Sequence, residues 1–93
     1  MKAYEVMYIL KPCDDDKVKE IVAKVAKTIT TNGGVIVKSD IWGEKRLAYT
    51  INDCDKGIYI LDTFNMDEER VKELVRVMDI SEDIIRYMII SKH

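Results

Sequence analysis

Residues 3–34 read AYEVMYILKPCDDDKVKEIVAKVAKTITTNGG, a strand pattern followed by a helix pattern. The first eight of these residues are rich in aromatic and β-branched side chains, and Pro12 cannot continue a central strand. Apolar residues then recur at helical spacing, in the order Val18, Ile21, Val22, Val25, Ala26 and Ile29. We predict a strand over 3–10 and an amphipathic helix that begins at the carboxylates of 14–16 and ends at the glycines of 33–34.

The rest of the chain repeats this strand-helix order with a hairpin inserted first. Residues 35–51 are extended around Gly43, where we expect a bulge or a close backbone approach, and 58–64 return after the turn residues 53–57. A second apolar stripe consists of Val71, Leu74, Val75 and Met78, and residues 84–91 form the last strand. The order βαββαβ predicts an α+β, ferredoxin-like fold, with a four-stranded, mainly antiparallel sheet and two helices on one face. We expect a shared core of Val6, Leu10, Ile21, Val25, Leu74 and Met78.

The first strand and the overall composition narrow the class of protein. Both faces of strand 3–10 are fairly apolar, which predicts a central strand whose second face is also covered. With 47% hydrophobic residues and one proline among 93, the chain is expected to form one globular domain over 1–93. Two cysteines without a CxxC pair are typical of free thiols in a reduced compartment. Because no membrane span or signal-peptide pattern is present, we expect a cytoplasmic protein without a membrane partner.

The residues with catalytic chemistry do not form an active-site pattern. His93 is the last residue, a poor place for a general base, and Cys13 has neither a nearby histidine nor a resolving cysteine. The acidic clusters at 14–16 and 53–55 do not fit a calcium-binding loop, whereas capping and turn roles account for them. Since GxGxxG, P-loop, HExxH and GxSxG motifs are also missing, we predict no enzyme, no metal and no cofactor.

A basic and aromatic segment lies in the predicted hairpin. Lys45 and Arg46 are adjacent cations close to Trp42 and Tyr49, and such groups can grip phosphate and stack on a base or a partner side chain. An edge strand protected by charge is an equally good interpretation on physical grounds alone. A net charge of −2 argues against a large, purely electrostatic RNA surface but leaves room for a local one. The strand that begins at Lys56-Gly57 lacks the stacking aromatics of a known RNA-binding motif, so we expect little base-specific readout.

The run from Gly43 to Ile51 has the form G-x-K-R-L-[SA]-Y-x-I and resembles the signature of the bacterial small-subunit ribosomal protein six family. Tyr4-Glu5-Val6, Pro12 and the strand 86–90 also resemble that family, and the likeness covers essentially the whole chain. Thr50 departs from it, because many members carry proline there. The resemblance implies a structural constituent of the small (30S) ribosomal subunit, which binds 16S ribosomal RNA together with small-subunit ribosomal protein eighteen and supports subunit assembly and translation. A basic partner would explain how a nearly neutral chain binds RNA.

On this interpretation, the cations on or beside strands are the RNA-binding candidates: Lys2, Lys45, Arg46, Arg86 and Lys92. We expect Trp42 and Tyr49 to contact the protein partner, and the pairing of the first and last strands to bring Lys2 near Lys92. Two rival functions share the fold. A regulatory or dimerisation module that binds a small ligand has no reason to carry the run 45–49. An acylphosphatase-type enzyme needs a phosphate-cradling loop with an arginine, whereas here residues 11–13 precede an acidic triplet.

Overall fold

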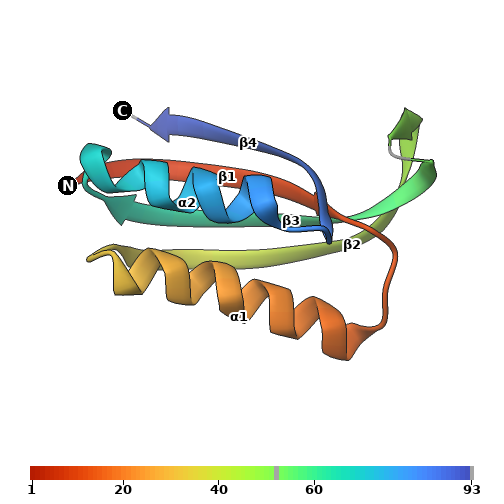
Figure 1. Cartoon of the computed structure of the whole chain (residues 1–93), viewed down its shortest axis with the longest axis horizontal. Coiled ribbons are helices and arrows are strands. Elements are labelled where there is room, and N and C mark those ends of the chain that lie inside the picture. Colours follow the sequence, from red (N-terminus) through yellow and green to blue (C-terminus); the bar gives the residue numbers. More distant parts are fainter. Residues whose placement is uncertain (52, 93) are drawn as a thin grey trace.

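Four strands form one sheet, and two helices pack against one of its faces (Figure 1). The computed structural model describes residues 1–51 and 53–92. The elements are β1 (Lys2–Leu10), α1 (Asp15–Thr31), β2 (Val35–Ile51), β3 (Cys54–Met66), α2 (Glu68–Ile80) and β4 (Ile84–Lys92). This βαββαβ order with both helices on one face confirms the predicted ferredoxin-like fold. Neither helix in the described part of the chain combines the length and the hydropathy that a bilayer crossing requires.

The strands follow the order β2-β3-β1-β4, and every neighbouring pair is antiparallel. β1 lies in the interior of the sheet, where Tyr8 is opposite Ile60 of β3 on one side and Tyr87 of β4 on the other. The prediction that the first strand is central and adjoins the last strand is therefore confirmed. β2 and β4 form the two edges.

Local sequence signals fix both ends of α1. The Asp14 carboxylate Oδ1 accepts a hydrogen bond of 2.8 Å from the backbone N–H of Lys17, which satisfies one of the donors left free at a helix start. At the other end Gly33 has φ +81°, a left-handed conformation that glycine adopts without a Cβ penalty. The backbone N–H of Gly34 then donates to the Ile29 carbonyl at 2.9 Å. The predicted start and end of this helix are both confirmed.

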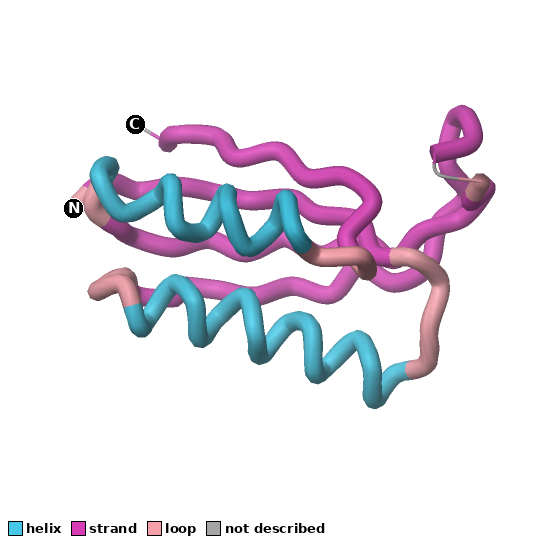
Figure 2. Tube along the Cα trace, viewed as in Figure 1, coloured by secondary structure: helices cyan, strands magenta, loops and turns pink. Residues whose placement is uncertain are grey.

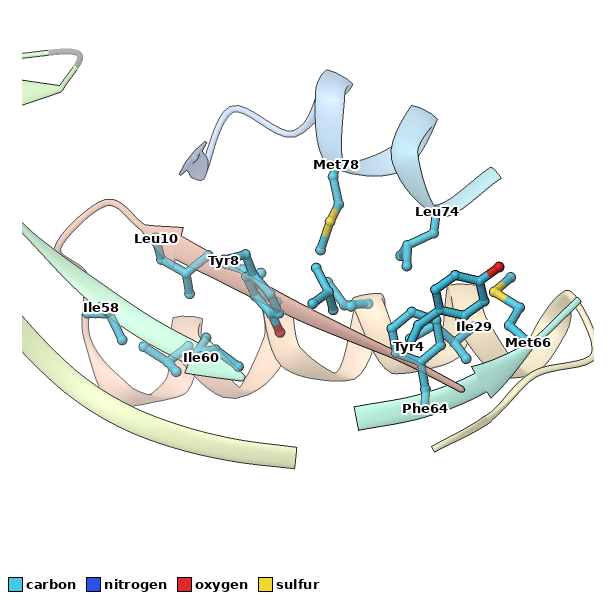
Figure 3. Close-up of a cluster of buried hydrophobic side chains, with 14 residues drawn as sticks. Tyr4, Tyr8, Leu10, Ile29, Ile58, Ile60, Phe64, Met66, Leu74 and Met78 are labelled. Carbon is cyan, nitrogen blue, oxygen red and sulfur yellow. The ribbon is translucent and has the colours of Figure 1, made fainter. Parts of the chain in front are cut away.

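The core lies between the helices and the sheet (Figure 3). Alternate residues of β1 point into it, and the Tyr4 ring stacks on the ring of Phe64 with 5.7 Å between centroids. All six residues predicted for this core are buried: Val6, Leu10, Ile21, Val25, Leu74 and Met78. Burial of these apolar stripes supplies the main driving force for the fold.

The β2–β3 hairpin extends past the other strands (Figure 2). β2 is continuous over its 17 residues, with a break in register between Ile41 and Gly43, where Gly43 has φ +91°. The expected bulge is therefore present. The predicted turn over 53–57 is wrong in extent, because Ile51 already pairs with Cys54 and residues 54–57 belong to β3. Only Asp53, with φ +64°, has the turn conformation that we assigned to the whole acidic segment.

Candidate RNA and protein interface

The sheet face opposite the helices is not covered by a helix, and its side chains form cross-strand rows that differ in polarity. Strand register places three rows across β3, β1 and β4: Thr63, Glu5 and Ile90; Leu61, Met7 and Met88; and Tyr59, Ile9 and Arg86. The middle row is entirely apolar. Met88 and Ile90 are 55% and 48% exposed, respectively, so β4 holds a half-open apolar edge beside the interior strand.

The chain covers part of this face with the end of its own hairpin. Leu47 is buried and packs near Ile9, and Gly57 lies beneath both side chains. A Cβ at Gly57 would clash with Cγ2 of Ile9 and lie 3.6 Å from Cδ2 of Leu47, so this close approach requires glycine. Part of the cover that we expected over the second face of β1 is thus intramolecular.

A hydrogen bond ties the hairpin end to the opposite edge of the sheet. Arg86 Nη1 of β4 donates to the Tyr49 hydroxyl oxygen of β2 at 2.8 Å. Between the two strands lies a hollow of about 220 Å³, which we call the hairpin pocket. Its lining residues come from all four strands: Ile9, Leu47, Ala48, Tyr49, Ile51, Tyr59, Arg86 and Met88. The sequence analysis did not anticipate this pocket.

The predicted cations of the hairpin lie next to a predicted aromatic residue. Lys45 Nζ lies 5.1 Å from the centroid of the Trp42 ring, within the range of a cation–π contact. Lys45 and Arg46 are exposed, opposite Gly57 and Lys56 of β3, and neither forms an ion pair with a described residue. The structure therefore brings Lys45 to Trp42, and Arg86 to Tyr49.

Lys2 and Lys92 do not form a common site. Lys92 is opposite Ala3, on the open face, where its Nζ is 3.7 Å from Glu5 Oε2. Lys2 is the next residue of β1, so its side chain points to the helix side, and its Nζ donates to Glu68 Oε2 at 2.8 Å. This hydrogen bond and the accompanying charge attraction lower the pKa of Glu68 and raise the pKa of Lys2. The expected proximity of the two lysines is wrong in this respect, because neighbouring positions of a strand face opposite sides of the sheet.

The residues considered for catalysis gain no active arrangement. Burial, with the charges of Asp14 and Asp83, raises the pKa of the Cys13 thiol, which disfavours the thiolate that a reactive cysteine needs. His93 lies outside the described residues. Within residues 1–51 and 53–92, no three His, Cys, Asp or Glu side chains gather in a metal-binding arrangement.

Two features escaped the sequence analysis although alternation signals them. Tyr59 lies on the open face, because Ile58 and Ile60 on either side of it point into the core. Asp62 continues that inward alternation and is fully buried, with its Oδ1 accepting a hydrogen bond of 2.6 Å from the Ser39 hydroxyl. Counting in steps of two from either isoleucine places Asp62 on the core face and leaves Tyr59 on the opposite face.

Comparisons with known proteins agree on one family. The family model described as Ribosomal protein S6 matches residues 3–91. Proteins named small ribosomal subunit protein bS6 from Desulfitobacterium hafniense and Desulforamulus reducens are 43% and 44% identical over 93 residues, covering 99% of this chain and 98% of each relative. The crystal structure of 30S ribosomal protein S6 from Thermotoga maritima has a TM-score of 0.94 at 27% identity and covers 98% of this chain and 87% of that one. The C-terminal domain of the MgtC protein from Mycobacterium tuberculosis, with a TM-score of 0.70 at 13% identity over 99% of this chain and 88% of that one, shares only the fold.

Proposed function

This chain belongs to the ribosomal protein S6 family, and we propose that it binds 16S ribosomal RNA together with small-subunit ribosomal protein eighteen. Family membership makes the chain a non-enzymatic structural component of the small ribosomal subunit, which works in translation on cytoplasmic ribosomes. The predictions of a ribosomal role and of no enzymatic activity are thereby confirmed. The RNA contacts and the protein partner are supported by two separate surfaces.

The hairpin end is the proposed RNA contact, and Lys45 with Arg46 is the observation that carries it. Both cations are exposed and have no carboxylate partner among the described residues, so their charge is available to phosphate. Lys2 and Lys92 are weaker candidates, because carboxylates at 2.8 and 3.7 Å already offset their charge. We therefore rank the predicted RNA-binding residues with the hairpin pair first.

The open face of the sheet is the proposed protein contact. Its apolar row ends at the half-exposed Met88, and Trp42 and Tyr49 are 46% and 62% exposed at the hairpin. Sheets of this kind bury an apolar face against a second layer, and a partner can supply that layer. A basic partner also suits the net charge of −2, since it would provide phosphate neutralisation that this chain lacks.

Salt-dependent RNA binding tests the hairpin contact. A small-subunit ribosomal RNA junction is titrated with the chain and its partner over a salt series, for wild type and for Lys45→Ala/Arg46→Ala. If both cations contact phosphate, the slope of log affinity against log salt falls by about 1.4–1.8, at roughly 0.7–0.9 for each contact.

A matched control removes the same charge elsewhere. Lys24 and Lys27 are exposed lysines of α1, on the opposite side of the sheet, so Lys24→Ala/Lys27→Ala is expected to keep the wild-type slope. If wild type and the hairpin double variant have equal slopes and affinities, Lys45 and Arg46 do not contact RNA. Their role is then protection of the edge strand or contact with the partner.

A further inference from the structure

The hairpin pocket is a hollow on the open face that the RNA contact leaves unexplained. Ile9 and Leu47 are 8% and 7% exposed and form a packed part of its wall, whereas Tyr49, Arg86 and Met88 are exposed around it. The apolar row of Leu61, Met7 and Met88 leads directly into it, because Met88 also lines the pocket. The pocket thus adjoins the Met88 end of this apolar row.

Arg86 is the only charged residue among those that line the pocket. Its bond to the Tyr49 hydroxyl uses Nη1 and fixes the guanidinium at the rim. A guanidinium has five N–H donors, so most of them remain available to an acceptor on an incoming molecule. Arg86 forms no ion pair with a described residue.

We propose that the hairpin pocket receives one bulky apolar side chain of the protein partner, while Arg86 donates hydrogen bonds to a backbone carbonyl or carboxylate next to that side chain. This inference rests on the proposed function, which names small-subunit ribosomal protein eighteen as the partner. It also moves Arg86 from the RNA surface, where the sequence analysis placed it, to the protein interface. A few side chains that fill well-packed pockets carry most of the binding energy of a typical protein interface, and arginine is enriched among such residues.

The lining favours a protein occupant over an unpaired RNA base. Four of the eight lining residues are aliphatic and Met88 is a fifth flexible apolar side chain, and the cations proposed to grip phosphate, Lys45 and Arg46, do not line the pocket. A base would bring a charged backbone to a rim that holds a single cation. Met7 and Met88 are cross-strand partners beside the pocket, and flexible methionines suit an interface that adapts to protein side chains.

Filling the pocket is the direct test. Ala48 lines it and is exposed, so Ala48→Phe occupies the hollow without removing a contact. Calorimetry with purified small-subunit ribosomal protein eighteen as the probe should show affinity weakened about tenfold or more. Ala23→Phe, on the exposed face of α1, adds the same side chain elsewhere and should bind as wild type does.

A second pair of variants tests the rim. Arg86→Ala should also weaken binding of the protein probe, whereas Arg76→Ala, at an exposed arginine of α2, should not. Because Arg86 is exposed, its truncation leaves the fold intact, and a thermal unfolding scan of each variant verifies this. With the partner at a concentration that saturates each variant, the salt slope of RNA binding should stay at the wild-type value in both pocket variants.

The possible results separate this inference from the proposed function. Wild-type affinity for the probe in both Ala48→Phe and Arg86→Ala would overturn the pocket alone. If the pocket variants lose RNA binding but keep protein binding, the occupant of the pocket is an RNA base and not a side chain. If they change the oligomeric state, the occupant is a second copy of this chain. If the wild-type chain does not bind the probe, the proposed partner fails and the pocket assignment fails with it.

Discussion

On the helix-covered face of the sheet, Val6, Leu10 and Phe64 have no exposed surface, whereas on the open face Met88 and Ile90 remain about half exposed at 55% and 48%. Successive residues of the same antiparallel strands point to the two faces in turn, so strand geometry does not explain why one face is buried and the other exposed. The difference lies in what covers each face. Two helices complete the first face, while a bent hairpin covers only one end of the second. Residues of the first face should therefore govern stability, and exposed residues of the second should govern binding.

Truncation on the two faces is the largest test of this difference. Leu74→Ala, or Ile21→Ala, should cost about 2–5 kcal/mol of unfolding free energy, because both side chains are buried between helices and sheet. Met88→Ala should cost less than about 1 kcal/mol, because much of that side chain is already in water. Urea denaturation measures all three variants. A loss at Met88 as large as that at Leu74 would mean that the open face is part of the folding core.

At the hairpin end, side chains of the open face are closely packed and buried, as they are on the helix-covered face. Gly57→Ala should cost about 1–3 kcal/mol, because the added methyl group meets Cγ2 of Ile9 beneath Leu47. A double-mutant cycle sharpens this test, since the cost of Gly57→Ala should shrink in an Ile9→Ala background, where Cγ2 is missing. Both measurements use denaturant midpoints. An unchanged cost in that background would show that the glycine serves the backbone of β3 rather than the packing of the hairpin.

Residue periodicity predicted the helix-covered face well. The helical stripes identified four of the six predicted core residues, and the first strand contributed Val6 and Leu10. The strand, helix and turn signals together predicted the βαββαβ order. Those signals are local, so each can be read over ten to fifteen residues. The resemblance of the run 43–51 located the hairpin cations but said nothing of how the hairpin bends.

The features of the open face depend on contacts between distant parts of the chain. The Arg86 to Tyr49 bond joins residues 37 positions apart, and the pocket exists only because the hairpin end leans on β1 and β4. Neither follows from the alternation of a single strand. The opposite orientations of Lys2 and Lys92, by contrast, follow from register, once β1 and β4 are known to pair Ala3 with Lys92.

Asp62 is the exception on the helix-covered face, because it is the one fully buried charged residue among residues 1–51 and 53–92. Ser39 donates to Oδ1 at 2.6 Å, while neither Oδ2 nor the Tyr8 hydroxyl has a hydrogen-bond partner among the described residues. Burial raises the pKa of Asp62 above its ordinary value, despite the hydrogen bond from Ser39, and the charge of Asp40 adds to the rise. Burial also raises the pKa of Tyr8, and the negative charge of Asp62 raises it further. This carboxyl group weakens the face that otherwise stabilises the fold.

The smallest effect expected on the helix-covered face is a gain in stability from Asp62→Asn, of about 1 kcal/mol at pH 8, because the amide removes a buried charge and can still accept from Ser39. At pH values between the unfolded-state pKa of about 3.9 and the raised folded-state pKa, the Asp62 carboxyl group is protonated in the folded protein but ionised in the unfolded chain. The contribution of Asp62 to stability therefore falls as the pH rises through that window and stays low above it. The difference between the variant and wild type should be small at pH 4 and grow toward pH 8, as urea midpoints at several pH values would show. Ser39→Ala is the companion variant, and it should shift stability in the opposite direction at pH 8, because it removes the hydroxyl that donates to the carboxylate. If Asp62→Asn instead lowers stability, and by more at pH 8 than at pH 4, the ionised carboxylate is stabilised in the folded protein and the covered face has no weak point there.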